Sequence, residues 1–249
     1  MYPYLLHTGH LFLPTFGVLV AVGLMSALAL SLRTARLVGL HSDALWNAGL
    51  FMLLSAFVLS RLLLVTTNFV NFLHYPILLL MVPSLTPTGL LLTVMVTAIY
   101  LRVRHLPVLT TLDAWAPCAT LTWMFLALGH FAEGSDPGVP TTLPWGLPIP
   151  PDTTPRLHPV PLYAAIAGAA ITVMLMLGFA RRRRSGDVAA AALAAAGVTQ
   201  FLLTFVRQPS PYPVPFGSVL DPIQWIALGM VLASGVLVML PRKLVSHAV

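Results

Sequence analysis

The sequence predicts an all-α integral membrane protein, in which a single polytopic domain over residues 1–249 forms a seven-transmembrane-helix bundle. Hydrophobic residues make up 58% of the chain and charged residues only 8%, whereas a soluble domain has roughly 45–50% apolar and 25% charged residues. The mean hydropathy is +0.90. At about 20 residues per span, a chain of 249 residues is long enough for such a bundle. Because lipid offers the backbone no hydrogen-bond partners, we expect helices and no exposed sheet.

Apolar windows predict the individual spans. They lie near residues 12–32, 44–65, 87–103, 108–129, 160–180, 188–206 and 220–240. The stretch at 69–86 is too short and too closely bounded by prolines for a further span, so we expect an outer interfacial or re-entrant segment there. The segment 130–159 is long for a connection within a bundle, and long connections are often functional. We expect it to form an extracytoplasmic loop over a functional site.

The basic residues predict the orientation of these spans. Ten of the 13 lysines and arginines follow odd-numbered spans, and the loops after even-numbered spans hold only Arg156 and Arg207. Cytoplasmic loops are enriched in basic residues, so we expect the N-terminus outside and the C-terminus in the cytoplasm. The arginine run at 181–184 is then a topology anchor with some affinity for anionic lipid head groups. The basic residues carry no stacking aromatics, so we expect no nucleic-acid partner.

Charged residues inside the apolar spans are candidates for function. Arg61 lies near the outer end of the second span, and Arg207 ends the sixth. Burying a guanidinium in lipid costs about 2.5–3.5 kcal/mol, so a partner or a water-filled cavity is expected. Either arginine could hold the phosphate of a lipid head group in a rigid fork, and Arg61 could instead snorkel to the interface. Asp113, near the start of the fourth span, is expected to complement a helix dipole.

The long loop gathers polar groups of other kinds. Four titratable side chains are expected on one outer surface: His130, Glu133, Asp136 and His158. Their spacing matches no helical HExxH pattern, so we expect no metal ion. A histidine titrates near neutrality and is the better candidate for a proton acceptor. Trp145 and Tyr163 are amphipathic rings suited to the membrane interface.

Six motifs, taken in chain order, resemble those of the prolipoprotein diacylglyceryl transferase family. "FGVLVAVGLMSALALSLRTAR" is similar to the family's first span, "SRLLLV" to its GGRxGYV segment, and "LDAWAP" to the segment before its signature. "GHFAEGSDPGVPTTLPW" resembles the signature GRxxNFxNGExxGxxTxxPW, and "HPVPLY" resembles HPxQLYE. "FVRQP" followed by "IQW" resembles EFFRxP followed by GQ. The resemblance runs over nearly the whole chain.

The resemblance implies an enzyme of lipoprotein biosynthesis in the bacterial inner membrane. Its reaction transfers the diacylglyceryl group of phosphatidylglycerol to the lipobox cysteine thiol of a prolipoprotein, and no cofactor is expected. The thiol has a pKa of about 8.5, so a base or a positive field is needed to raise the fraction of thiolate. The departing phosphate needs cations that stabilise the charge it develops. Candidate catalytic residues are His130, His158 and Glu133. Candidate substrate-binding residues are Arg61, Gly134, Gly138, Trp145, Tyr163, Arg207 and Gln224.

The chain departs from the family at several positions that the family uses for chemistry. Aligned without a gap, the signature's arginine, asparagine and glutamate fall on Ala127, His130 and Ser135, and a short deletion would instead put His130 in the arginine's place. Other family positions are replaced by Phe16, Thr88, Pro161, Ala164, Gln200 and Thr204. Two hypotheses follow. The chain is a divergent transferase in which His130 or His158 activates the thiol, or a catalytically altered paralogue that binds phospholipid or lipoprotein without transfer.

Overall fold

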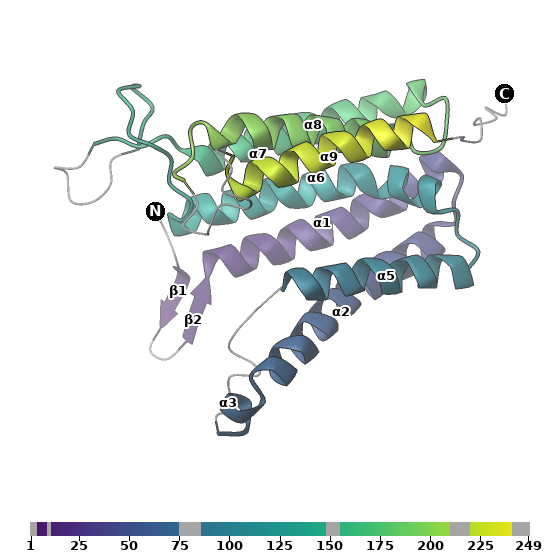
Figure 1. The fold of residues 1–249 in the computed structure, drawn as a ribbon, viewed down its shortest axis with the longest axis horizontal. Coiled ribbons are helices and arrows are strands. Elements are labelled where there is room, and N and C mark those ends of the chain that lie inside the picture. The colour runs from purple at the N-terminus through teal and green to yellow at the C-terminus, as the bar shows by residue number, and fades with distance from the viewer. Residues whose placement is uncertain (1–3, 9–10, 75–85, 148–154, 210–219, 241–249) are drawn as a thin grey trace. The chain divides into compact units, whose positions relative to one another are not determined.

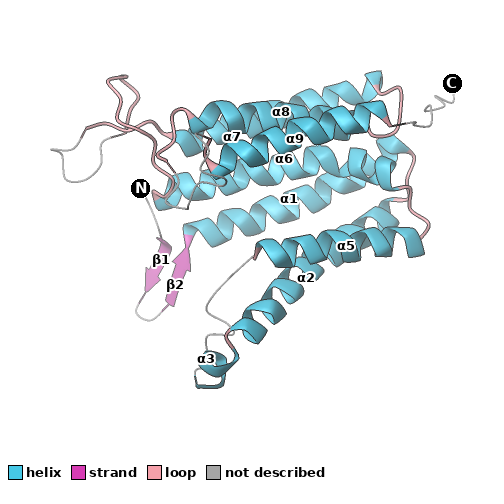
Figure 2. Ribbon diagram, in the orientation of Figure 1, coloured by secondary structure: helices cyan, strands magenta, loops and turns pink. Residues whose placement is uncertain are grey.

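The computed structural model describes residues 4–8, 11–74, 86–147, 155–209 and 220–240, and these residues are mostly helical (Figure 2). A two-stranded hairpin precedes the helices, with β1 at Tyr4–Thr8 and β2 at Leu11–Pro14. The long helices in the described part of the chain are α1 (Thr15–Val38), α2 (Ser42–Thr67), α5 (Pro87–Val103), α6 (Val108–Glu133), α7 (Val160–Gly178), α8 (Asp187–Thr204) and α9 (Pro222–Met239). The short elements are α3 (Phe69–His74) and η1 (Phe179–Arg181).

Each predicted span overlaps one of these long helices. Among the described residues, five helices are long and apolar enough to cross a membrane: α1, α2, α7 extended through η1, α8 and α9. The apolar helix at Thr88–Val103 within α5 is shorter. The chain is therefore a multi-pass membrane protein built from helices.

The N-terminal hairpin differs from the all-helical expectation. β1 and β2 pair antiparallel, with Leu6 opposite Leu13 and Thr8 opposite Leu11. Helix α1 begins at Thr15, so the prediction of helix from residue 12 is wrong. Proline cannot donate the backbone hydrogen bond of a helix interior, and Pro14 is the last residue of β2. The strand therefore ends, and the helix begins, at this proline.

The chain divides into two compact units. Unit 1 comprises Met1–Leu30 and Leu112–Val249, and unit 2 comprises Ser31–Thr111. Within unit 2, α2 packs against α5 through the small residue Gly89, because a Cβ there would lie 2.8 Å from the Cα of Ser60. The rings of Phe51 and Tyr100 stack at 4.3 Å between the same two helices. Of the segment predicted at 69–86, α3 is helical, Thr86 caps α5, and residues 75–85 lie outside the described residues.

In unit 1, α6 and α7 run antiparallel (Figure 1). Their contacts are consistent with this direction, because Thr120 meets Thr172 and the later residue Met124 meets the earlier residue Gly168. The hydroxyls of Thr120 and Thr172 lie 2.8 Å apart at mid-helix, and both side chains are buried. Gly168 lets α7 approach Met124 so closely that an added Cβ would lie 3.1 Å from its backbone nitrogen. Small residues at such crossings allow membrane helices to pack closely.

Helices α8 and α9 also run antiparallel in unit 1. The hydroxyl of Ser234 donates to the carbonyl of Ala190 at 2.8 Å, and Gly197 faces the carbonyl of Ala227. The alanine-rich stretch of α8 is largely buried, as expected for a small-residue packing face. Helices α6 to α9 therefore form the packed body of unit 1.

At one end of this body, Asp113 of α6 caps the first turn of α8. Its carboxylate accepts hydrogen bonds from the backbone N–H groups of Gly186 at 2.7 Å and Ala189 at 2.9 Å. It also forms an ion pair with Arg182 at 2.8 Å, in which both side chains are buried. Asp113 thus complements a helix dipole, as the sequence predicts, but the helix is α8 and not its own. Arg182 is consequently a structural partner rather than one of four equivalent exposed arginines.

Candidate functional site

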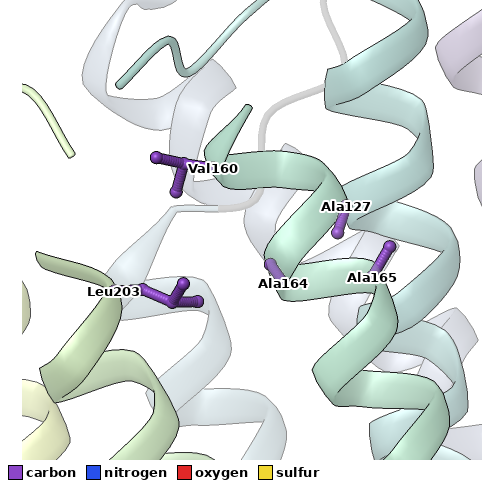
Figure 3. Packing of buried hydrophobic residues seen from close by; sticks show 5 residues of the cluster. All are labelled: Ala127, Val160, Ala164, Ala165 and Leu203. Carbon is purple, nitrogen blue, oxygen red and sulfur yellow. The ribbon is translucent and has the colours of Figure 1, made fainter. Parts of the chain in front are cut away.

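The other end of unit 1 brings the end of α6, the start of α7 and the end of α8 together. A core cluster joins them, and Figure 3 shows its members: Ala127, Val160, Ala164, Ala165 and Leu203. Val160 is fully buried, and Tyr163 and Val206 pack against the cluster. Because these helix ends are fixed by a common core, the polar residues that follow them in the chain are held near one another.

Helix α6 extends four residues beyond the predicted end at 129 and closes with a glycine cap. Gly134 adopts a left-handed φ of +79°. The backbone N–H of Ser135 donates to the carbonyl of His130 at 3.0 Å, and that of Gly134 donates to the carbonyl of Phe131 at 3.3 Å. This pair of hydrogen bonds is the Schellman motif, which favours glycine at the left-handed position. Gly134, a predicted substrate-binding residue, therefore has a structural reason for its identity.

His130 and Glu133 both lie in the last turn of α6 and meet the side chain of Ser135. The Oγ of Ser135 lies 2.7 Å from Nδ1 of His130 and 3.3 Å from Oε2 of Glu133. The ring of Phe16 lies against the imidazole, with centroids 5.0 Å apart. The structure thus joins two of the predicted catalytic residues through a serine that the sequence analysis did not select. A helix end followed by glycine and serine is the sequence signal for this arrangement.

Arg207 pairs with Asp136 across 71 residues of sequence. Its Nη2 donates to Oδ2 of Asp136 at 2.7 Å, and the two side chains are 15% and 31% exposed. Asp136 holds a left-handed φ of +60°, which is uncommon for a residue other than glycine. The Nε of Arg207 is buried and has no hydrogen-bond partner among the described residues. A mostly buried guanidinium with donor capacity to spare is suited to binding an anion.

Gly138 is the point where the loop crosses both the end of α8 and the start of α7. Its N–H donates to the carbonyl of His158 at 3.0 Å, and Val139 donates to the carbonyl of Val206 at 2.9 Å. A Cβ at Gly138 would lie 2.6 Å from each of three atoms, namely Cβ and O of His158 and O of Val206. Only glycine fits this crossing, which positions His158 and Arg207 on either side of it.

His158, Tyr163 and Trp145 form a second network. The indole Nε1 of Trp145 donates to the hydroxyl of Tyr163 at 2.8 Å, and that hydroxyl lies 3.4 Å from Nδ1 of His158. Trp145 is 57% exposed, whereas His158 and Tyr163 are partly buried. The loop carrying Trp145 is therefore fastened to α7 by the side chain that the sequence predicted for the interface.

In the described part of the chain, two of the predicted substrate-binding residues, Gln224 and Arg61, take part in neither of the two histidine networks nor in the Arg207–Asp136 pair. Gln224 completes a capping box with Asp221 at the start of α9, and its Nε2 donates to the hydroxyl of Thr204 at 3.0 Å. Both ends of its amide are thus engaged within unit 1. Arg61 is a partly buried residue of α2 and belongs to unit 2.

Apolar helices of spanning length, together with an end of unit 1 that gathers imidazole, carboxylate and guanidinium groups, define a multi-pass membrane protein with a polar site at a helix-bundle end. A family model described as prolipoprotein diacylglyceryl transferase matches residues 3–240. The chain belongs to this family.

Individual relatives agree with the family match. The chain is similar to proteins named phosphatidylglycerol–prolipoprotein diacylglyceryl transferase from Cereibacter sphaeroides, with 34% identity over 63% of this chain and 56% of the relative. The relative from Paracidovorax citrulli is 31% identical over 58% of this chain and 55% of the relative. The relative from Cupriavidus metallidurans is 32% identical over 56% of this chain and 53% of the relative. The chain therefore spans about half the length of the curated relatives it matches.

Proposed function

We propose that this protein transfers the diacylglyceryl group of phosphatidylglycerol to the lipobox cysteine thiol of prolipoproteins, in the bacterial inner membrane. The observation that carries the proposal is Arg207, a mostly buried guanidinium fixed by Asp136, with a buried Nε that has no partner among the described residues. It lies at the end of unit 1 that also holds His130 and His158, in a chain matched to the family over residues 3–240.

The reaction places different demands on the cation and on the base. The thiolate attacks the carbon of the diacylglyceryl group that is bonded to the phosphate oxygen. That carbon–oxygen bond breaks, a thioether forms, and glycerol phosphate leaves. The phosphate gains negative charge as it leaves, and Arg207 is suited to stabilise that charge through charge-assisted hydrogen bonds. The thiol proton goes to an imidazole, for which His130 and His158 are the candidates.

The remaining predicted contacts are assigned to substrate positioning. Trp145 and Tyr163 offer large amphipathic rings at the level of a lipid head group. Arg61 is kept as a predicted contact to lipid, and Gln224 acts through the capping of α9 and the end of α8. Gly134 and Gly138 shape the loop that carries these groups.

We also propose that α5 and α6 cross the membrane with the other five apolar helices, giving seven spans. Residues 134–147 and 155–158 then face outward, and the arginines at 181–184 face the cytoplasm. The positive-inside distribution of basic residues supports this orientation. The lipobox cysteine thiol of a translocated prolipoprotein, which accepts the lipid group, would then reach the site from the outer side of the membrane.

A second candidate function is favoured by Ala127. The gapless alignment puts the family's signature arginine at this position, and Ala127 is only 4% exposed within the core cluster of α6, α7 and α8. An arginine could not replace it without unpacking that core. A paralogue that has lost this arginine would bind phosphatidylglycerol or lipoprotein without transferring the lipid group.

Complementation of a strain depleted of its own transferase separates the two candidates. An active transferase restores growth and produces lipid-modified prolipoprotein, and replacing the active histidine by alanine slows the reaction by roughly 100-fold. Both His130→Ala and His158→Ala are tested, because either ring can serve. Unmodified prolipoprotein, together with phosphatidylglycerol retained on the purified protein, would support the binding function instead.

A further inference from the structure

The side chain of Ser135 has a particular set of neighbours at the end of α6. Its Oγ lies 2.7 Å from Nδ1 of His130, 3.3 Å from Oε2 of Glu133 and 3.4 Å from the carbonyl oxygen of His130. A carboxylate and a carbonyl can only accept a hydrogen bond, whereas a ring nitrogen of histidine can donate or accept. The hydroxyl has one proton to donate, and its three neighbours differ in whether they can also donate a hydrogen bond.

One arrangement gives both Nδ1 of His130 and the carboxylate of Glu133 a hydrogen bond. The hydroxyl donates its proton to Glu133, and Nδ1 of His130 carries a proton and donates it to Oγ. In the opposite arrangement the hydroxyl donates to Nδ1, and Glu133 loses its hydrogen bond from Ser135. Because a hydrogen bond to a carboxylate is stronger than one between neutral groups, the first arrangement is favoured.

The closure of α6 does not require these side chains. The backbone N–H groups of Gly134 and Ser135 already complete the Schellman motif, so the cap forms without the hydroxyl. Glu133 is exposed and lies at the C-terminus of the helix, where an acidic side chain is unfavourable by about 0.3–1 kcal/mol. The Ser135 hydroxyl contacts the imidazole of His130, and Glu133 contacts that hydroxyl. Neither side chain is needed by the helix, which points to a role at His130.

We propose that Ser135, oriented by Glu133, is a positioning residue that holds His130 in the tautomer protonated at Nδ1 and leaves Nε2 free to accept a proton. The ring of Phe16 packs against the imidazole, at a centroid distance of 5.0 Å and a tilt of 52°. The role of Nε2 as the base for the substrate thiol rests on the proposed transferase function. The tautomer itself does not.

His158 provides an internal comparison. Its Nδ1 also faces a hydroxyl, that of Tyr163, but at 3.4 Å, and that hydroxyl accepts a hydrogen bond from Trp145. Among the described residues, this hydroxyl contacts no carboxylate. Because its oxygen accepts from the indole, its proton is directed to the ring nitrogen of His158. The two histidines are thus expected to differ in the nitrogen that carries the proton.

Nitrogen NMR of the full chain, labelled with ¹⁵N-histidine and held in lipid nanodiscs under mildly alkaline conditions, tests the tautomer directly. The signal of His130 is assigned by its disappearance in His130→Gln. We expect Nδ1 of His130 to be protonated in the wild-type protein, and this preference to be lost in Ser135→Ala and kept in Ser135→Thr. The signal of His158 serves as the control and should not change. A wild-type His130 protonated at Nε2, or one unaffected by Ser135→Ala, would overturn the inference.

Kinetics then separate this inference from the proposed function. If His130 is the base, Ser135→Ala lowers kcat by roughly 10- to 100-fold with little change in KM, because substrate binding is left intact, and Ser135→Thr restores the rate. If the NMR result holds but kcat does not change, the positioning of His130 stands and its assignment as the base is wrong.

Discussion

At the scale of single residues, the Arg207–Asp136 pair determines what the site can bind. Arg207→Ala removes the guanidinium, and a hydrogen bond to a charged group contributes about 1.5–3 kcal/mol. We expect at least roughly tenfold less phosphatidylglycerol retained on the purified protein, measured by quantitative mass spectrometry of extracted lipid. Arg156→Ala is the matched control, because Arg156 is an exposed arginine in the segment between α6 and α7, and its Nη1 donates to the carbonyl of Pro144 at 3.0 Å. Equal retention by the two variants would remove Arg207 from lipid binding.

A second residue-scale prediction concerns the crossing at Gly138. Gly138→Ala forces a methyl group against two backbone carbonyl oxygens and the Cβ of His158, each at 2.6 Å, and overpacking of this kind costs about 1–3 kcal/mol. We expect a lower midpoint of thermal unfolding, followed by a thiol-reactive dye that reaches Cys118, which is buried in the folded chain. Gly229→Ala on α9 is the control, since nothing lies within 4 Å of its added Cβ. An unchanged midpoint in Gly138→Ala would mean that the loop adjusts without strain.

These residue contacts mark the limit of what the sequence predicts. The titratable residues of the loop can be selected because a polar segment between apolar spans is conspicuous. Their partners cannot, because Arg207 and Asp136 are separated by 71 residues and no local pattern relates them. Gln224 and Gly134 illustrate the opposite case, since a capping box and a left-handed cap explain residues that resemblance alone assigns to substrate.

At the scale of helices, Asp113 ties α6 to the start of α8. Asp113→Ala deprives the buried Arg182 of its counter-charge and leaves two backbone N–H groups of α8 without their acceptor. Breaking a buried ion pair in this way costs about 3–5 kcal/mol. We expect a large fall in the unfolding midpoint, measured with the same thiol dye. Asp43→Ala is the control, because Asp43 is an exposed residue in the first turn of α2, where an acid contributes only about 0.3–1 kcal/mol.

Helix positions are predictable from hydropathy, whereas helix ends are not. All the predicted spans fall on helices because apolar runs of this length have few other ways to satisfy their backbone in lipid. The end of α6 at Glu133 depends on the glycine cap at Gly134, which hydropathy does not register. The pairing of β1 with β2 is not predicted for a similar reason, because hydropathy does not distinguish the apolar strand β2 from the apolar helix α1 that follows it.

At the scale of the whole molecule, the remaining question is which end of unit 1 faces outward. The contact of Asp113 with Arg182 defines one end, and that of Gly138 with His158 and Val206 defines the other. Helices α6, α7 and α8 run between these ends, so reporters placed at each must label from opposite sides of a membrane. The family match does not fix this direction, and the arginines at 181–184 are the charges that predict it.

Single-cysteine reporters test the direction in whole cells. In a Cys118→Ala background, Thr142→Cys places a thiol at an exposed loop position, and Ser185→Cys places one beside the arginine run. We expect a membrane-impermeant maleimide to label the reporter at 142 in intact cells and the reporter at 185 only after permeabilisation. Labelling only of the reporter at 185 in intact cells would invert the topology and put His130 and Arg207 on the cytoplasmic side. Because a translocated lipobox thiol could not reach them there, that result would also exclude the proposed reaction, whatever the lipid affinity of Arg207.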